Sequence, residues 1–204
     1  MNRLIANEDF IVKNYNKTIE LLQLAQLPEL ERLIAKYSDR YSTAPASTNE
    51  EYYSAFPGGL CYHNLQTVNG LMKLSQALCP NKFQRSSLVK VGFLAELGKI
   101  GDASKDYFIP VDSDWHNKKG IYYEYNKELS FMRIVHRSLF FAQVNGVEVS
   151  EEEYLAILAI DQAGENNSPY AYRENDLGFL LQTAIRWSQK QAKENKVIWA
   201  KSPA

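Results

Sequence analysis

The hydrophobic residues of this chain recur mostly at the spacing of α-helices. Leu30, Leu33, Ile34 and Tyr37 follow the i, i+3, i+4, i+7 pattern of one helix face, and Pro28 stands where a first helical turn would begin. Further helices are predicted at residues 14–26, 60–78, 86–98, 134–144, 151–162 and 176–194. The chain is therefore expected to be mainly α-helical, with about six or seven helices.

Two of these helices are expected to form the centre of the domain. The helix at 86–98 is apolar almost all round, which is typical of a buried helix, and it carries Glu96. The buried face of the helix at 60–78 is predicted from residues that share one side of it: Leu60, His63, Thr67, Leu71, Leu74 and Leu78. Ser150 and Glu153 predict a capping box for the helix at 151–162, and Gly146 predicts the end of the helix before it.

One segment, residues 105–125, has a different character. Residues 107–109 and 121–123 are rich in aromatic and β-branched side chains, which predicts two short strands. The loop between them is polar and contains Asp112, Asp114 and His116, with Trp115 predicted to pack onto the body. We therefore expect a small β-hairpin attached to a helical body.

Composition and charge restrict the class of protein. The 204 residues suit a single domain, and the formal charge of -1, from 23 basic and 24 acidic residues, gives no reason to expect nucleic acid as the main partner. No apolar run is long enough to span a membrane, and the N-terminus does not resemble a signal peptide. Cys61 and Cys79 cannot form a disulfide framework. We expect a cytoplasmic protein that does not contact membranes.

Three stretches, taken together, resemble the HD-domain superfamily, in particular the small HD-like proteins of bacteria and their phages. The first stretch runs from residues 44–47 through 55–60 to His63, the second is VGFLAELGKIGD at 91–102, and the third is LGFLLQTAIRWS at 177–188. The resemblance covers about residues 40–190. It implies one HD-domain-like helical bundle over residues 1–204, with helices at 14–37 packed on it. It also implies a divalent metal site that hydrolyses phosphate esters, often those of nucleotides.

The chain departs from this family at most of the metal ligands. His63 matches the first metal-binding histidine, but Ala95 and Glu96 stand where active members have a His-Asp pair. Ile185 stands at the distal aspartate, and Tyr53 stands where some members have a further histidine. Two donors make only a weak, hydrated site. We therefore expect a catalytically degenerate member with no bound cofactor; the alternative is one divalent metal ion held by His63 and Glu96.

Glu96 needs a partner because a carboxylate in so apolar a helix is otherwise costly to ionise. Lys99 could pair with it along the helix, and His63 could do so across the helix interface. We favour a structural His63–Glu96 pair that takes the place of the metal. Lys99 matches a lysine that often faces phosphate in active relatives, but it would equally suit the C-terminal end of a helix dipole.

Three functions remain open. The leading hypothesis is a regulatory protein that binds a nucleotide or phosphate through Lys99, Arg173, Arg186 and Asp161 without hydrolysing it. The second is an active metal-dependent phosphohydrolase with ligands drawn from His63, Glu96, Asp102, Asp112, Asp114, His116 and Asp161. The third is a structural or interaction protein of phage origin, located in the host cytoplasm. It would form a homo-oligomer or bind a protein partner through an aromatic patch, since the chain has 13 Tyr and 9 Phe.

Overall fold

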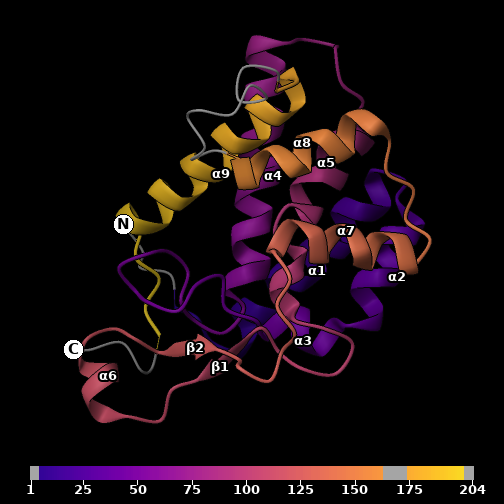
Figure 1. Cartoon of the computed structure of the whole chain (residues 1–204). Coiled ribbons are helices and arrows are strands. Elements are labelled where there is room, and N and C mark those ends of the chain that lie inside the picture. The colour runs from indigo at the N-terminus through magenta and orange to yellow at the C-terminus, as the bar shows by residue number, and fades with distance from the viewer. Residues whose placement is uncertain (1–4, 163–173, 200–204) are drawn as a thin grey trace.

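The computed structural model describes residues 5–162 and 174–199, and within them the chain is mainly helical with one small antiparallel sheet (Figure 1). The helices are α1 (Glu8–Leu24), α2 (Pro28–Lys36), α3 (Ser38–Thr43), α4 (Gly59–Leu78), α5 (Arg85–Leu94), the 3-10 helix η1 (Leu97–Ile100), α6 (Asp114–Lys118), α7 (Ile134–Val144), α8 (Glu151–Gln162) and α9 (Asp176–Glu194). The strands are β1 (Phe108–Pro110) and β2 (Tyr123–Tyr125). The predicted fold class, mainly α with a small hairpin, is confirmed.

Local capping chemistry explains several helix boundaries. Pro28 begins α2, as predicted. Proline has no backbone N–H, and a residue in the first turn of a helix needs none, because that N–H has no intrahelical acceptor. The predicted capping box of α8 is present: the Ser150 N–H donates to Glu153 Oε2 at 2.9 Å, and the Glu153 N–H donates to Ser150 Oγ at 3.2 Å. Gly146 follows the C-cap of α7 with a φ of 71°, which is the left-handed conformation expected of it.

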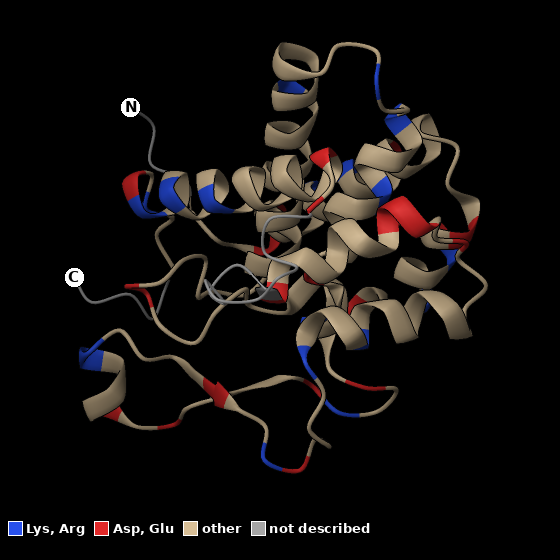
Figure 2. Cartoon of the chain, turned by 45° about the horizontal axis from the view of Figure 1, so that its top comes forward, with Lys and Arg blue, Asp and Glu red and all other residues tan. Residues whose placement is uncertain are grey.

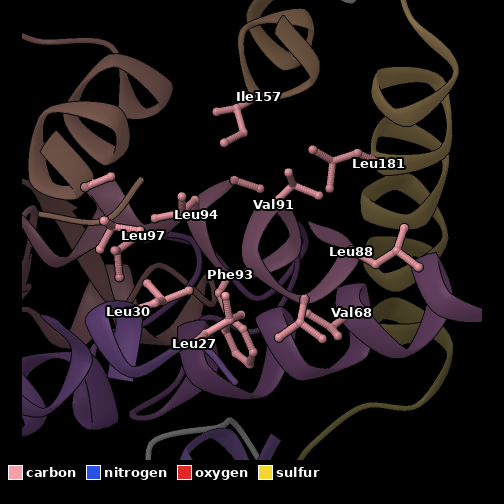
Figure 3. Close-up of a cluster of buried hydrophobic side chains, with 14 of the residues drawn as sticks. Leu27, Leu30, Val68, Leu88, Val91, Phe93, Leu94, Leu97, Ile157 and Leu181 are labelled. Carbon is pink, nitrogen blue, oxygen red and sulfur yellow. The ribbon is translucent and has the colours of Figure 1, made fainter. Parts of the chain in front are cut away.

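The core forms where α4 packs against α1, α3, α5 and α9. Side chains from five elements point toward one another there: Leu30 from α2, Val68 from α4, Phe93 from α5, Leu97 from η1 and Leu181 from α9 (Figure 3). The exposed fraction of each is close to zero. The prediction that the helix at 86–98 is buried on nearly all sides is confirmed for α5.

The predicted helix at 86–98 is instead two elements, α5 and η1, with a break at Ala95 and Glu96. The reason lies in the contact of η1 with α7. The Gly98 N–H donates to Ser138 Oγ of α7 at 2.7 Å, which removes it from a continuous α-helical ladder. A Cβ on Gly98 would lie 2.3 Å from the carbonyl oxygen of Ile134, so only glycine permits this close approach.

Other helix predictions differ in extent. α1 begins at Glu8 rather than at residue 14, because Asn7 caps it by accepting a hydrogen bond from the Phe10 N–H. The short helix α3 was not predicted. Leu78, which was expected on the buried face of α4, is exposed at the last turn of that helix.

The hairpin projects from the helical body near one end of the molecule (Figure 1). β1 and β2 pair in antiparallel register, with Phe108 opposite Tyr125. The second strand therefore lies two residues later than predicted, because Ile121 forms an isolated bridge with Asn49 instead.

The connection between the two strands is also more structured than predicted. It contains the short helix α6, whose N-cap Ser113 accepts a hydrogen bond from the His116 N–H. The prediction that Trp115 packs onto the body is wrong: it is 59% exposed and instead contacts Lys119, whose ammonium lies 3.8 Å from its ring centroid.

Within the described residues, no helix combines the length and the apolar character that crossing a membrane requires. Positively and negatively charged residues are scattered over the ribbon, most of which carries neither (Figure 2).

A substitution at Gly98 tests whether the close contact of η1 with α7 determines the break between α5 and η1. We expect Gly98→Ala to lower the free energy of unfolding by roughly 1–3 kcal/mol, because its methyl group would overlap the backbone of α7. Gly70→Ala is the matched control, since its Cβ would meet only ordinary contacts at 3.7 Å and alanine favours a helix. Chemical denaturation measures both; equal stability of the two variants would contradict the argument.

Candidate functional site

The candidate site is built around His63 and Glu96, which come from different helical segments. His63 lies on α4 and is 1% exposed; Glu96 lies between α5 and η1 and is also buried. Nε2 of His63 lies 3.1 Å from Oε2 of Glu96, within ion-pair distance, and neither atom has a hydrogen-bond partner among the described residues. The contact is therefore mainly electrostatic, and the predicted pairing across the helix interface is present.

Lys99 supplies the positive charge that balances the carboxylate of Glu96. Its ammonium lies 2.9 Å from Oε1 of Glu96, and it donates to the Tyr53 hydroxyl at 2.7 Å and to the carbonyl oxygen of Ala46 at 2.8 Å. An ammonium group has three donors, so all of them have acceptors. The Tyr53 hydroxyl in turn donates to Oε1 of Glu96 at 3.0 Å. We refer to Tyr53, His63, Glu96 and Lys99 as the central cluster.

The other side of His63 contacts α9. Nδ1 of His63 lies 3.3 Å from Oγ of Ser188, which also lies 3.0 Å from Oγ1 of Thr67. The Ser188 hydroxyl donates its single proton to the carbonyl oxygen of Ile185 at 2.9 Å, so its contacts with His63 and Thr67 compete with that hydrogen bond. The histidine thereby links α4, α9 and the break after α5.

The electrostatics of the central cluster favour a permanent ion pair. Burial alone would raise the pKa of Glu96, but Lys99 and then His63 outweigh burial and hold that pKa well below its ordinary value of 4.5. Burial alone would lower the pKa of Lys99, but Glu96 and Tyr53 raise it above 10.5. Burial and the Glu96 charge raise the pKa of Tyr53 to about 12. At neutral pH the carboxylate and ammonium are charged and the phenol is neutral.

This arrangement leaves little for a metal ion to bind. Oε1 of Glu96 faces both Lys99 and Tyr53, and Oε2 faces His63. Ala95 and Ile185, at two positions where the resemblance to HD-domain proteins would place ligands, are buried, and their side chains offer no donor atom. In residues 5–162 and 174–199, no three or more His, Cys, Asp or Glu side chains gather as a metal site would need.

The predicted ligand-binding residues occupy separate places. Lys99 belongs to the central cluster, whereas Arg186 is exposed on α9 and Arg173 lies outside the described residues. Asp161 lies near the end of α8, where Oδ2 is buried, 4.0 Å from Nη1 of Arg133, and without a hydrogen-bond partner. No hydrogen bond or ion pair joins Lys99, Asp161 and Arg186 to one another.

The alternative metal ligands of the loops serve local structure. Oδ1 of Asp102 accepts from the N–H groups of Ser104 and Lys105, which forms a turn. His116 makes a 2.9 Å contact from Nδ1 to Oγ of Ser113, within the connection between the strands.

Sequence reasoning missed two arginines near this region. Arg40 donates to the carbonyl oxygens of Ile100, Asp102 and Lys105, so it holds the loop that follows η1. Arg137 is a buried cation on α7 with one hydrogen bond. It lies among apolar residues in the stretch IVHRSLFFAQV, so the reasoning that singled out Glu96 would have found it.

Comparison with known proteins gives no match: no family model, no curated protein and no solved structure corresponds to this chain. The resemblance to HD-domain proteins therefore depends on the three sequence stretches, and it stays a prediction.

A double-mutant cycle tests the strength of the Glu96–Lys99 pair. We expect Glu96→Gln and Lys99→Met each to lower the free energy of unfolding by roughly 3–5 kcal/mol, because each leaves an uncompensated or poorly solvated partner in the core. The double variant should lose about 0.5–3 kcal/mol less than the sum of the single losses.

The control for this cycle is the exposed pair Lys190–Glu194 on α9, whose ions lie 3.8 Å apart. Solvent screens that pair, so its coupling should stay below about 1 kcal/mol. Strictly additive losses at Glu96 and Lys99 would show that the buried ions do not stabilise each other.

The pH dependence of stability provides a second test. Folding lowers the pKa of Glu96, so its stabilisation is complete above about pH 4.5 and declines as the pH falls below that value. Folding raises the pKa of Lys99, so its stabilisation is complete below about pH 10.5 and declines above it. Denaturation at pH 7 and at acid pH should show the gap in stability between wild type and Glu96→Gln narrowing in acid. A gap that stays constant would contradict the low pKa.

Proposed function

We propose that this chain is a catalytically inactive HD-domain-like protein that binds a nucleotide or another phosphate-bearing ligand without metal-dependent hydrolysis. The observation that carries the proposal is the ammonium of Lys99, 2.9 Å from Oε1 of Glu96, at the centre of the positions where active relatives bind metal. An internal cation there supplies the positive charge that a divalent ion would otherwise supply.

Charge and access both support the absence of hydrolysis. A divalent ion bound to Glu96 would lie within a few ångströms of the Lys99 ammonium, and repulsion between like charges in a low-dielectric interior is strong. Both ring nitrogens of His63 face protein atoms, Nε2 toward Glu96 and Nδ1 toward Ser188. The central cluster therefore acts as a structural element of the fold.

The contacts of Lys99 also affect where a phosphate would bind. All donors of Lys99 already have acceptors within the protein, so a phosphate at Lys99 would have to displace Glu96, Tyr53 or the Ala46 carbonyl oxygen. Other cations would then have to bind the phosphate. One of them is Arg186, which is exposed on α9.

A second candidate function is protein interaction, and a groove between α7 and α8 favours it. The groove encloses about 320 Å³. Polar and apolar side chains both line it: His136, Leu139, Phe140, Gln143, Val147, Val149 and Tyr154. Phe140 and Tyr154 are both exposed, and exposed apolar surface of this kind is typical of contact sites between proteins.

Metal analysis and a nucleotide screen test the leading proposal. Protein purified without chelator should contain no stoichiometric divalent metal and should release no phosphate or pyrophosphate from nucleotides in Mg²⁺ or Mn²⁺. At least one nucleotide should raise the melting temperature, since a ligand that binds only the native state stabilises it. Stoichiometric metal, or hydrolysis that a chelator abolishes, would overturn the proposal.

Two variants separate the role of Lys99 from general effects of charge. Lys99→Met removes the internal cation and should raise the affinity of the His63–Glu96 pair for added Zn²⁺, measured by calorimetry. Lys190→Met removes an exposed cation and should change nothing. A lack of nucleotide stabilisation together with a stable oligomer in light scattering would favour the interaction function instead.

A further inference from the structure

Helix α7 contains a buried cation that forms no ion pair with a described carboxylate. Arg137 is 4% exposed, and its one hydrogen bond runs from Nη2 to the carbonyl oxygen of Ser130 at 2.7 Å. Its Nε is buried and has no hydrogen-bond partner. Within the part of the chain that the structure describes, Arg137 forms no ion pair with a carboxylate. A guanidinium presents five donors, so most of its capacity is unused.

Two cations with little solvent exposure show what Arg137 lacks. The buried Lys99 is paired with Glu96, and the partly buried Lys90 lies 2.9 Å from Oε2 of Glu153. Buried charges are ordinarily paired, because desolvation without a partner is costly. An unpaired, buried guanidinium therefore indicates a site that an anion from outside the chain completes.

The start of α7 provides a second source of positive potential at the same place. α7 has 11 residues, its N-cap Arg133 makes no side-chain capping hydrogen bond, and its first turn contains no acidic residue. The free N–H groups and the dipole of such an end attract anions. Arg137 lies one turn into the helix, where side chains lean back toward the N-terminus, and its Nη2 reaches Ser130 before the helix begins.

The one carboxylate that pairs with this helix end does so loosely. Oδ2 of Asp161 lies 4.0 Å from Nη1 of Arg133, whose side chain is largely exposed. Asp161 forms no ion pair with Arg137, and neither does Asp102. The N–H of Ser104 and, to a smaller extent, Arg137 lower the pKa of the Asp102 carboxyl.

We propose that Arg137 and the first turn of α7 form a binding site for an oxyanion, the phosphate or carboxylate group of a ligand. The planar fork of arginine matches both groups through two parallel hydrogen bonds. The identity of the ligand as a nucleotide rests on the proposed function above; the oxyanion site itself rests on Arg137. The site provides the phosphate contact that Lys99, with its donors occupied, does not.

The experiment compares wild type with Arg137→Met in inorganic phosphate and in acetate, at constant ionic strength, by calorimetry and thermal shift. Wild type should show saturable binding and, at about ten times the dissociation constant, a rise in melting temperature of roughly 3–6 °C. Arg137→Met should lose this response. Arg32→Met is the matched control, because Arg32 is exposed, pairs with Glu29 on α2 and should leave the response unchanged.

Each result decides the question. A response to phosphate alone assigns a phosphate site, and a response to acetate as well assigns a general oxyanion site. The absence of saturable binding to wild type, or an equal response in Arg137→Met, overturns the proposal.

If Arg137→Met does not fold, Arg137→Lys keeps the charge but not the fork. It should bind at least several-fold more weakly than wild type, and unchanged affinity would overturn the proposal. Phosphate binding that depends on Arg137, in a protein that no nucleotide stabilises, would sink the proposed function and leave this site standing.

Discussion

The buried ion pair of Glu96 and Lys99 is the contact on which the centre of this structure depends. The two charges are buried, so each requires the other together with the hydrogen bonds of Tyr53 and the contact with His63. These partners come from the connection before α4, from α4 itself and from the α5–η1 break. The pair thus fixes how three segments far apart in the sequence meet.

Two buried cations of the same protein illustrate how differently a charge can be accommodated. Lys99 has an acceptor for every donor and therefore serves the fold. Arg137, on the neighbouring helix, has one acceptor and no carboxylate. Because the cost of burial is the same in kind for both, the difference indicates that Arg137 serves a partner the chain does not contain.

The break after α5 connects the fold to the site. Gly98 gives its N–H to Ser138 of α7 and lets the two backbones approach closely, which converts the end of the predicted helix into the 3-10 turn η1. Glu96 is the N-cap residue of this turn and Lys99 lies within it, and Arg137 packs against it: a Cβ on Gly98 would lie 3.0 Å from Cβ of Arg137. The Glu96–Lys99 pair and Arg137 therefore both lie next to the close approach of η1 to α7 at Gly98.

The sequence by itself determined most of the helices, the capping box at Ser150 and the need of Glu96 for a partner, because periodicity, caps and the cost of a buried carboxylate are local properties. Which partner Glu96 takes was narrowed to His63 and Lys99, and only the tertiary structure showed that both contact it. The tertiary structure alone decided that α5 ends at Leu94, that Trp115 faces solvent and that Nε of Arg137 is buried without a hydrogen-bond partner. Each of these depends on which residues distant in sequence come into contact, and spacing along the chain does not specify that.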